Sequence, residues 1–164
     1  MAERPRLSPI TETDRPVLER LWQLYSHDMS DVRGTLPNAD GMFKSGRLPT
    51  YLDDPDACGY LITYRDAPAG FAFVRTQPDA TRIMGDFFVV RAARRRRVGY
   101  DVARELLRRH PGRWEIGFQG GNTGAPEFWR RLATDVVGER WREELRSVPG
   151  KPHIPHDHFI LLEV

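Results

Sequence analysis

A run of arginines stands between two apolar segments of this 164-residue chain. Arg91 and the four consecutive arginines from Arg94 to Arg97 follow the sequence FFVV, and VGYDVARELL comes after them. Such a cluster can bind the phosphates of a nucleic acid, cradle a smaller anion, or form a solvated loop. Nearly all the basic residues of the chain are arginines, so the position of the run must carry the argument.

The run lies where a strand is expected to pass into a helix. FFVV is typical of a buried strand, and apolar residues recur after the arginines at helical spacing, at Val98, Val102, Leu106 and Leu107. A helix N-terminus presents unpaired amides that suit a phosphate, and Gly99 lets the backbone approach a ligand closely. The segment lacks both GxxxxGK[ST] and GxGxxG, so neither a nucleotide P-loop nor a dinucleotide fold is indicated.

Composition narrows these alternatives. The chain has 25 basic and 23 acidic residues and a net charge of +2, so no broad positive field covers its surface. No aromatic stacking platform accompanies the arginines, which argues against nucleic-acid binding. With 40% hydrophobic and 29% charged residues, we expect one folded domain spanning residues 1–164.

Cysteine content and hydropathy indicate the cellular compartment in which the protein is expected. Cys58 is the only cysteine, and nothing at the N-terminus resembles a secretory leader, so we expect a cytoplasmic protein. No apolar run is long enough to span a membrane. Cys58 alternates with Tyr60 and Ile62, and we expect it to be packed in a buried strand.

Hydrophobic periodicity predicts an α/β (α+β) protein. The expected order is a strand, a helix, an irregular segment with one or two helical turns, three antiparallel strands, a helix, a strand, a helix and two strands. The strands are expected at 6–10, 57–65, 69–76, 82–90, 113–119, 136–145 and 156–164, and the DAPAG sequence at 66–70 is expected to turn. The first helix is expected to be capped by Thr13 or Asp14 and the last by Asn122 or Thr123. The strands on either side of the arginine-led helix should be parallel, in a central β-α-β unit.

The residues from Arg94 to Gly99 resemble the acetyl-CoA motif of the GNAT superfamily of N-acetyltransferases. That motif is glutamine or arginine, two variable residues, glycine, one variable residue, then glycine or alanine. Here Gly99 fills the last position, and Arg97 replaces the first glycine. We expect Arg97 to keep an ordinary backbone conformation and to direct its side chain away from the pyrophosphate.

The resemblance extends over most of the chain. It includes AGFAFV and the family-like spacing of Asn122, Ala125 and Trp129, and FFVV…RR and PGRWE…N…FWR are similar to a bacterial branch of predicted acetyltransferases. It implies a mixed, mostly antiparallel sheet of six to seven strands flanked by helices, with acetyl-CoA as co-substrate. The coenzyme-binding residues it implies are Phe88, Val89, Val90, Arg94, Arg95, Arg96, Arg97, Val98, Gly99, Tyr100, Asn122 and Trp129, the first three through their backbone.

The same resemblance implies a general base on or near the strand before the motif. Asp86 shares a strand face with Phe88 and Val90 and is the first candidate, with Glu115 second. Each of the two carboxylates could instead be a satisfied polar group. Trp129 occupies the position of the tyrosine that acts as general acid in the family, and it could simply belong to the core. A thiol with a pKa of about 8.5 can leave without that acid.

Two further groups of residues were weighed for binding. In the family, the first helix and the segment after it select the acceptor, so Tyr25, His27 and Asp28 are candidate substrate-binding residues; a solvated helix end is the alternative. Near the C-terminus, four residues could supply metal ligands: His153, His156, Asp157 and His158. Because no cysteine or second carboxylate completes the coordination, we expect no metal there.

Three functions follow. The first is transfer of acetyl from acetyl-CoA to an amine by direct attack in a ternary complex, with a small molecule or a peptide as acceptor. The second is a CoA-binding regulatory or interaction module that has lost catalysis, which the replacements at Arg97 and Trp129 would favour. The third is nucleic-acid binding through the arginines. Dimers are common in such folds, so a homodimer remains open.

Overall fold

The elements of the chain follow the expected order. The structure is a computed structural model that describes residues 3–122 and 124–164. The strands are β1 (Arg6–Pro9), β2 (Ala57–Tyr64), β3 (Ala67–Thr76), β4 (Arg82–Val89), β5 (Arg113–Gln119), β6 (Trp141–Arg146) and β7 (Asp157–Glu163). The helices are α1 (Arg15–Arg33), α2 (Leu48–Asp53), α3 (Val98–Arg109) and α4 (Ala125–Val137), with 3-10 turns η1 (Glu12–Asp14) and η2 (Arg91–Ala93).

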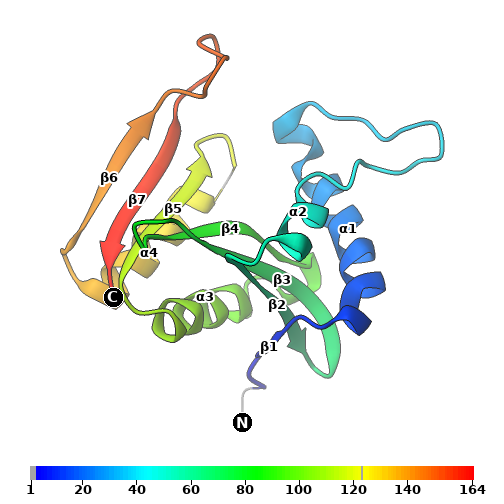
Figure 1. The fold of residues 1–164 in the computed structure, drawn as a ribbon, viewed down its shortest axis with the longest axis horizontal. Helices are drawn as coiled ribbons and strands as arrows, with labels where there is room; N and C mark the ends of the chain where they lie inside the picture. The colour runs from blue at the N-terminus through cyan, green and yellow to red at the C-terminus, as the bar shows by residue number, and fades with distance from the viewer. Residues whose placement is uncertain (1–2, 123) are drawn as a thin grey trace. The chain divides into compact units, whose positions relative to one another are not determined.

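The strands form one seven-stranded sheet in the order β1-β2-β3-β4-β5-β7-β6 (Figure 1). β4 and β5 are parallel, with Arg82–Met84 opposite Trp114–Ile116. β1 pairs with β2, β5 with β7, and β7 with β6, and all three pairs are antiparallel. The predicted mixed, mostly antiparallel sheet with a central β-α-β unit is therefore confirmed. None of the helices in the described part of the chain is long and apolar enough to cross a membrane.

The chain divides into two compact units. One comprises Met1–Val74 with Asp86–Val102, and the other comprises Arg75–Gly85 with Ala103–Val164. The arginine junction lies in the first unit, and α4 lies in the second. The single domain over 1–164 stays a prediction.

Aromatic packing builds the core of the first unit. The buried side chains of α1 and α2 meet those of β3 and β4 there. Trp22 of α1 stacks on Phe71 with ring centroids 5.4 Å apart, and Tyr51 of α2 stacks on Phe73 at 4.4 Å. Burial of such large rings supplies much of the energy that holds the two helices on the strands.

The ends of α1 follow from local chemistry. The Asp14 carboxylate accepts hydrogen bonds from the backbone and hydroxyl of Thr11, at 2.8 and 2.9 Å. These bonds belong to η1; Asp14 occupies the N-cap position of α1, as one of the two expected candidates, but its side chain makes no capping hydrogen bond to that helix. The helix continues through Arg33, past the Ser30 at which the apolar pattern breaks, and ends at Gly34 with φ of +63°.

The segment between α1 and α2 forms a long loop (Figure 1), and its returning arm is hydrogen-bonded to α1. The side-chain amide of Gln23 donates to the Phe43 carbonyl at 2.9 Å and accepts from the Phe43 amide at 2.8 Å. Farther out, the Asn38 side-chain oxygen accepts from the amides of Asp40 and Met42. This irregular segment therefore has a defined path.

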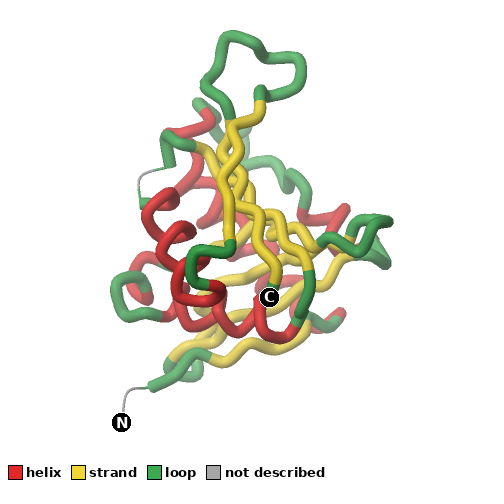
Figure 2. The backbone as a smooth tube through the Cα atoms, turned by 90° about the vertical axis from the view of Figure 1, so that its left-hand side faces the viewer, coloured by secondary structure: helices red, strands yellow, loops and turns green. Residues whose placement is uncertain are grey.

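In the second unit, α4 packs against β5, β6 and β7. Trp129, Ala133 and Val137 lie four residues apart on its buried face. The strand expected from residue 136 begins only at Trp141, because Val137 completes this buried stripe of the helix. The segment between β6 and β7 extends past the two strands as a long loop (Figure 2).

Two local expectations are corrected. The turn between β2 and β3 consists of Arg65 and Asp66, with φ of 53° and 57°, so it includes only the first residue of the expected 66–70 turn, and β3 already begins at Ala67. Positive φ at both central residues matches the right-handed twist of a two-residue hairpin. Cys58 is exposed, although Tyr60 and Ile62 are buried as expected. It is the second residue of β2 and precedes the residues from Tyr60 to Thr63 that pair with β1.

Candidate active site

The arginine junction begins with η2 and ends where α3 starts. The four arginines from Arg94 to Arg97 are all exposed. Arg95 and Arg97 have φ of 60° and 63°, in the left-handed region. The expectation that Arg97 keeps an ordinary conformation is therefore wrong: it adopts the backbone that the family's glycine adopts easily, at a cost of roughly 1 kcal/mol.

The side chain of Arg97 runs along α3. Its Nε lies 4.0 Å from the Asp101 carboxylate, and its guanidinium lies over the Tyr100 ring at 5.1 Å from the centroid. A phosphate bound at the first turn of α3 would meet the backbone of this residue, since the side chain is directed toward Tyr100 and Asp101.

Asp28 joins this junction to α1. Its carboxylate accepts from Nε of Arg91 at 3.0 Å and from Nη2 of Arg94. Arg94 also donates through Nε to the Val89 carbonyl at 2.7 Å. Asp28 was predicted to bind the acceptor, and the structure places it against the predicted coenzyme loop.

The end of β4 lies very close to β3. The Val90 amide donates to the Ala69 carbonyl at 2.8 Å, so this predicted ligand donor is already paired within the protein. A Cβ on Gly70 would lie 2.0 Å from the Phe88 carbonyl oxygen. Only glycine permits this approach, because every other side chain would displace the β4 backbone.

Asp86 is buried and bound by four side chains. Its Oδ1 accepts from the Tyr25 hydroxyl at 2.5 Å and from Nη2 of Arg47 at 3.1 Å. Its Oδ2 accepts from Nε of Arg47 at 3.1 Å and from the Tyr51 hydroxyl at 2.9 Å. Nη2 of Arg33 lies 3.8 Å from Oδ1 and donates to the Tyr25 hydroxyl at 2.9 Å.

Burial and Asp86 together set the protonation of the two phenols. Burial first, and then the negative charge of Asp86, raises the pKa of Tyr51 to about 12. The same two causes raise the pKa of Tyr25 even further. Burial alone would lower the pKa of Arg47, but Asp86 and then Tyr51 act against it and leave that pKa raised. Both phenols are therefore neutral donors at physiological pH.

This arrangement constrains Asp86 as a base. Each of its oxygens already accepts two hydrogen bonds, which fills the favoured lone-pair positions. A proton could reach Asp86 either after one donor moves away or through the Tyr25 hydroxyl, which can pass its own proton to Oδ1. The catalytic assignment of Asp86 stays a prediction.

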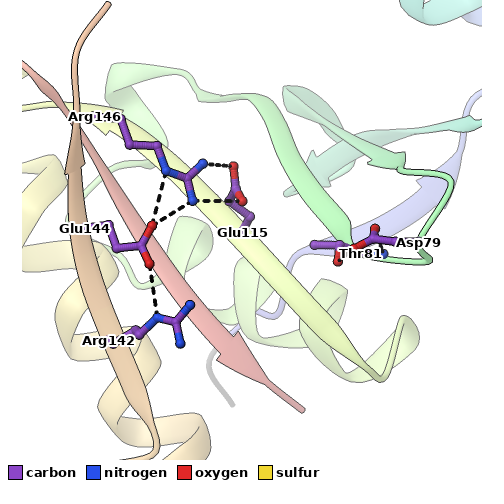
Figure 3. A network of polar contacts seen from close by, with 6 residues as sticks. All are labelled: Asp79, Thr81, Glu115, Arg142, Glu144 and Arg146. Carbon is purple, nitrogen blue, oxygen red and sulfur yellow. Dashed lines mark hydrogen bonds and ion pairs between the residues drawn. The ribbon is translucent and has the colours of Figure 1, made fainter.

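Glu115, the second candidate base, lies in a separate network of the second unit (Figure 3). Arg146 of β6 donates to both of its oxygens, at 2.7 and 3.3 Å. The guanidinium of Arg146 lies over the Phe159 ring of β7 at 4.3 Å, and it also binds Glu144, which in turn accepts from Arg142. Glu115 is thus engaged in holding three strands together, and its catalytic role too stays a prediction.

The remaining assigned residues have structural contacts. Trp129 is buried and packs edge to face on Phe128, with centroids 4.7 Å apart. The Asn122 carbonyl accepts from the Ala125 amide at 3.0 Å at the start of α4. The alternative cap Thr123 lies outside the described residues, and Gly124 occupies the N-cap position.

The C-terminal histidines, at positions 153, 156 and 158, are not arranged as the ligands of a metal ion. His158 stacks on Phe118 at 5.3 Å, and its Nδ1 lies 2.6 Å from Oε1 of Glu143. Among residues 3–122 and 124–164, no group of three histidine, cysteine or acidic side chains could hold a metal ion. His27 contacts Phe43, with ring centroids 6.4 Å apart.

Sequence reasoning missed the partners of Asp86. Arg33, Arg47 and Tyr51 come from the segment that was expected to be irregular after the first helix, in which the sequence pattern did not define the elements. A carboxylate placed in an apolar strand needs cationic or hydrogen-bonding partners, and that requirement was a usable signal. It could not choose among so many arginines.

Comparisons with solved structures show the class of fold. An acetyltransferase from Thermus thermophilus aligns over 99% of both chains, with 17% identity and a TM-score of 0.73. The ribosomal-protein-S18-alanine N-acetyltransferase of Escherichia coli aligns over 98% of this chain and 94% of its own, with 14% identity and a TM-score of 0.66. A Vibrio cholerae spermidine N-acetyltransferase, solved with CoA and spermine, aligns over 98% and 95%, with 7% identity and a TM-score of 0.69.

The chain therefore has the fold of the GNAT-type N-acetyltransferases, and the resemblance predicted from its sequence is confirmed at the level of the fold. No protein-family model and no curated protein sequence matches it.

Proposed function

We propose that this protein transfers the acetyl group of acetyl-CoA to an amine. The observation that carries the proposal is the junction between β4 and α3 within an N-acetyltransferase fold. There, exposed arginines and a first helical turn containing Gly99 follow directly on a buried strand. Unpaired amides at a helix N-terminus and flanking guanidiniums suit the pyrophosphate of CoA.

Different residues of the first unit would bind different parts of acetyl-CoA. Amides at the start of α3 would bind the pyrophosphate, with Arg95 and Arg96 beside it. Arg94 lies between Asp28 and the Val89 carbonyl, so it would orient the loop as well as attract the phosphates. The backbone of Phe88 and Val89 would hold the pantetheine arm and the thioester.

The reaction needs one bond formed and one broken. The neutral amine attacks the thioester carbonyl carbon, a C–N bond forms, and the C–S bond then breaks. The amine proton leaves to a base or to water, and the departing thiolate takes up a proton from solvent. A thiol of pKa about 8.5 is a competent leaving group without a dedicated acid, so Trp129 at the tyrosine position is compatible with transfer.

Calorimetry with acetyl-CoA is the first test. We expect saturable binding in the micromolar range and release of free thiol when a suitable amine is added. No binding at millimolar acetyl-CoA would reject the proposal. Arg6→Ala, which removes an exposed arginine of β1 paired with Asp66, controls for a general change of charge.

A CoA-binding module without transfer is the second candidate. The occupied lone pairs of Asp86 and the buried indole of Trp129 favour it. It predicts coenzyme binding with no thiol release across a broad panel of amines. Release with any amine would reject this alternative.

A further inference from the structure

The group around Asp86 carries an excess of positive charge. It contains one carboxylate, two guanidiniums and two phenols whose raised pKa keeps them neutral. Arg33 and Arg47 carry two positive charges and Asp86 carries one negative charge, so one positive charge of the group is not compensated. A partly buried site with such an excess attracts an anion.

Arg47 is oriented to bind that anion. It contacts Asp86 through Nε and Nη2, one edge of the planar guanidinium. A guanidinium has five N–H donors, so three remain on the edge that includes Nη1. Those three have no protein acceptor among the residues that the structure describes. The Arg47 side chain is 65% exposed, whereas that of Asp86 is only 4% exposed, so the second edge is accessible.

Arg33 adds a second, partly covered charge. Its guanidinium lies over the Tyr25 ring at 5.2 Å from the centroid, and its side chain is 35% exposed. Two guanidiniums on one carboxylate make a rigid pair, because Asp86 and the two phenols restrict the positions that they can adopt. A preorganised pair loses little conformational entropy when it binds an anion.

The pair is also near the proposed reacting atoms. Asp86 and Phe88 are two residues apart on β4, which corresponds to roughly 7 Å along a strand. Arg33 ends α1 and Arg47 immediately precedes α2. An acceptor whose amine reaches the thioester at Phe88 would thus bring a nearby substituent to these two arginines.

We propose that the acceptor is an amine that carries a carboxylate, and that Arg47 and Arg33 bind this carboxylate. The inference rests on the proposed acetyl transfer and specifies its substrate class. It excludes polyamines as preferred acceptors, because their cationic tails would be repelled by the uncompensated arginine charge.

The test compares matched acceptors with the full-length protein. Each α-amino acid in a panel is paired with its carboxamide and with the corresponding decarboxylated amine, and thiol release is measured with acetyl-CoA. We expect kcat/KM to be at least about tenfold higher for the best acid than for its amide. Arg47→Gln should reduce this ratio to about two, mainly by raising KM for the acid. Arg6→Gln should leave the ratio unchanged.

The outcomes separate the two proposals. Thiol release with amides or plain amines as fast as with the acids would overturn the carboxylate inference and leave acetyl transfer intact. No release with any amine would reject transfer itself, and this inference with it. The comparison of acids with amides uses the unaltered protein, so it decides the matter even if Arg47→Gln folds poorly.

Discussion

Asp28 of α1 and Arg94 of the arginine junction form an ion pair that joins the first helix to the start of the predicted coenzyme loop. The same carboxylate binds Arg91, and Arg94 reaches back to the carbonyl of Val89. The loop is therefore joined to α1 at Arg91 and Arg94, whereas Arg96 donates to the Ala92 carbonyl, at 3.3 Å, within the loop itself.

This contact distinguishes two arginines by their expected effects. Arg96→Ala removes an exposed charge and should weaken acetyl-CoA binding about threefold, an effect that disappears at high salt. Arg94→Ala also frees the loop and should weaken binding about tenfold, with a loss that persists in part at high salt. Calorimetry at two salt concentrations measures both. Equal, fully salt-sensitive losses would contradict an orienting role for Arg94.

The left-handed backbone of Arg97 predicts a stabilising substitution. Arg97→Gly should raise the free energy of unfolding by roughly 0.5 kcal/mol, because relief of about 1 kcal/mol of backbone strain exceeds the cost of about 0.5 kcal/mol in added chain entropy. Arg96→Gly is the matched control, since Arg96 does not share the positive φ. It should lower stability by about 0.5 kcal/mol through added chain entropy. Denaturant unfolding of both variants gives the sign, and a loss with Arg97→Gly would be evidence against the strained conformation.

Gly70 should tolerate no side chain. Gly70→Ala places a methyl group against the Phe88 carbonyl and should cost about 3 kcal/mol, lowering Tm by roughly 6–12 °C. It should also weaken acetyl-CoA binding, because the displaced backbone is the one proposed to hold the thioester. Gly121→Ala is the control, since an added Cβ there meets nothing within 4 Å. Similar melting temperatures for the two variants would refute the close approach.

Asp86→Asn tests both structure and chemistry. The amide cannot accept from both phenols and Arg47, so we expect a loss of about 2 kcal/mol in unfolding free energy. This is less than for a fully buried pair, since Arg47 is largely exposed. Turnover should fall more than acetyl-CoA affinity. A pH–rate profile that keeps its acidic limb in this variant would redirect attention to Glu115.

Glu143 should make stability depend on acid pH. Hydrogen bonding by Arg130 lowers its pKa from 4.5 to about 2, with His158 contributing in the same direction. A depressed folded-state pKa stabilises the protein above the unfolded value, and this contribution is lost as pH falls from about 4.5 to about 2. Glu143→Gln should therefore be less stable at pH 7 and show a flatter decline below pH 5. Unfolding over a pH series measures this, with the exposed Glu139→Gln as control; parallel curves for the wild type and Glu143→Gln would exclude the effect.

The order of elements was predictable because its signals are local. The spacing from Val98 to Leu107 and the HPG sequence at 110–112 define α3 without reference to the rest of the chain. The boundary between α4 and β6 was not predictable in this way, since Val136 and Val137 suit either element and only their packing decides.

The sequence predicted the strand that carries Asp86, but it did not predict the side chains that bind Asp86. The position of Asp86 on an apolar strand marked it as unusual, but its contacts with Tyr51 and Arg47 join segments more than thirty residues apart. Nothing local in the segment from 34 to 47 indicates that its one arginine, Arg47, returns to the strand. Likewise, Asp28 was predicted to bind the acceptor from its place at the end of the first helix, and no local signal indicated its two arginine partners, which lie more than sixty residues away.

The paired hydrogen bonds between Gln23 and Phe43 have a consequence for how this chain can vary. They anchor the far side of the irregular segment directly to α1, so the position of Arg47 is fixed over the few residues from Phe43 onward. The outer part, from Thr35 to Gly41, can lengthen or shorten at little entropic cost. Insertions there would leave the arginine pair of the site in place.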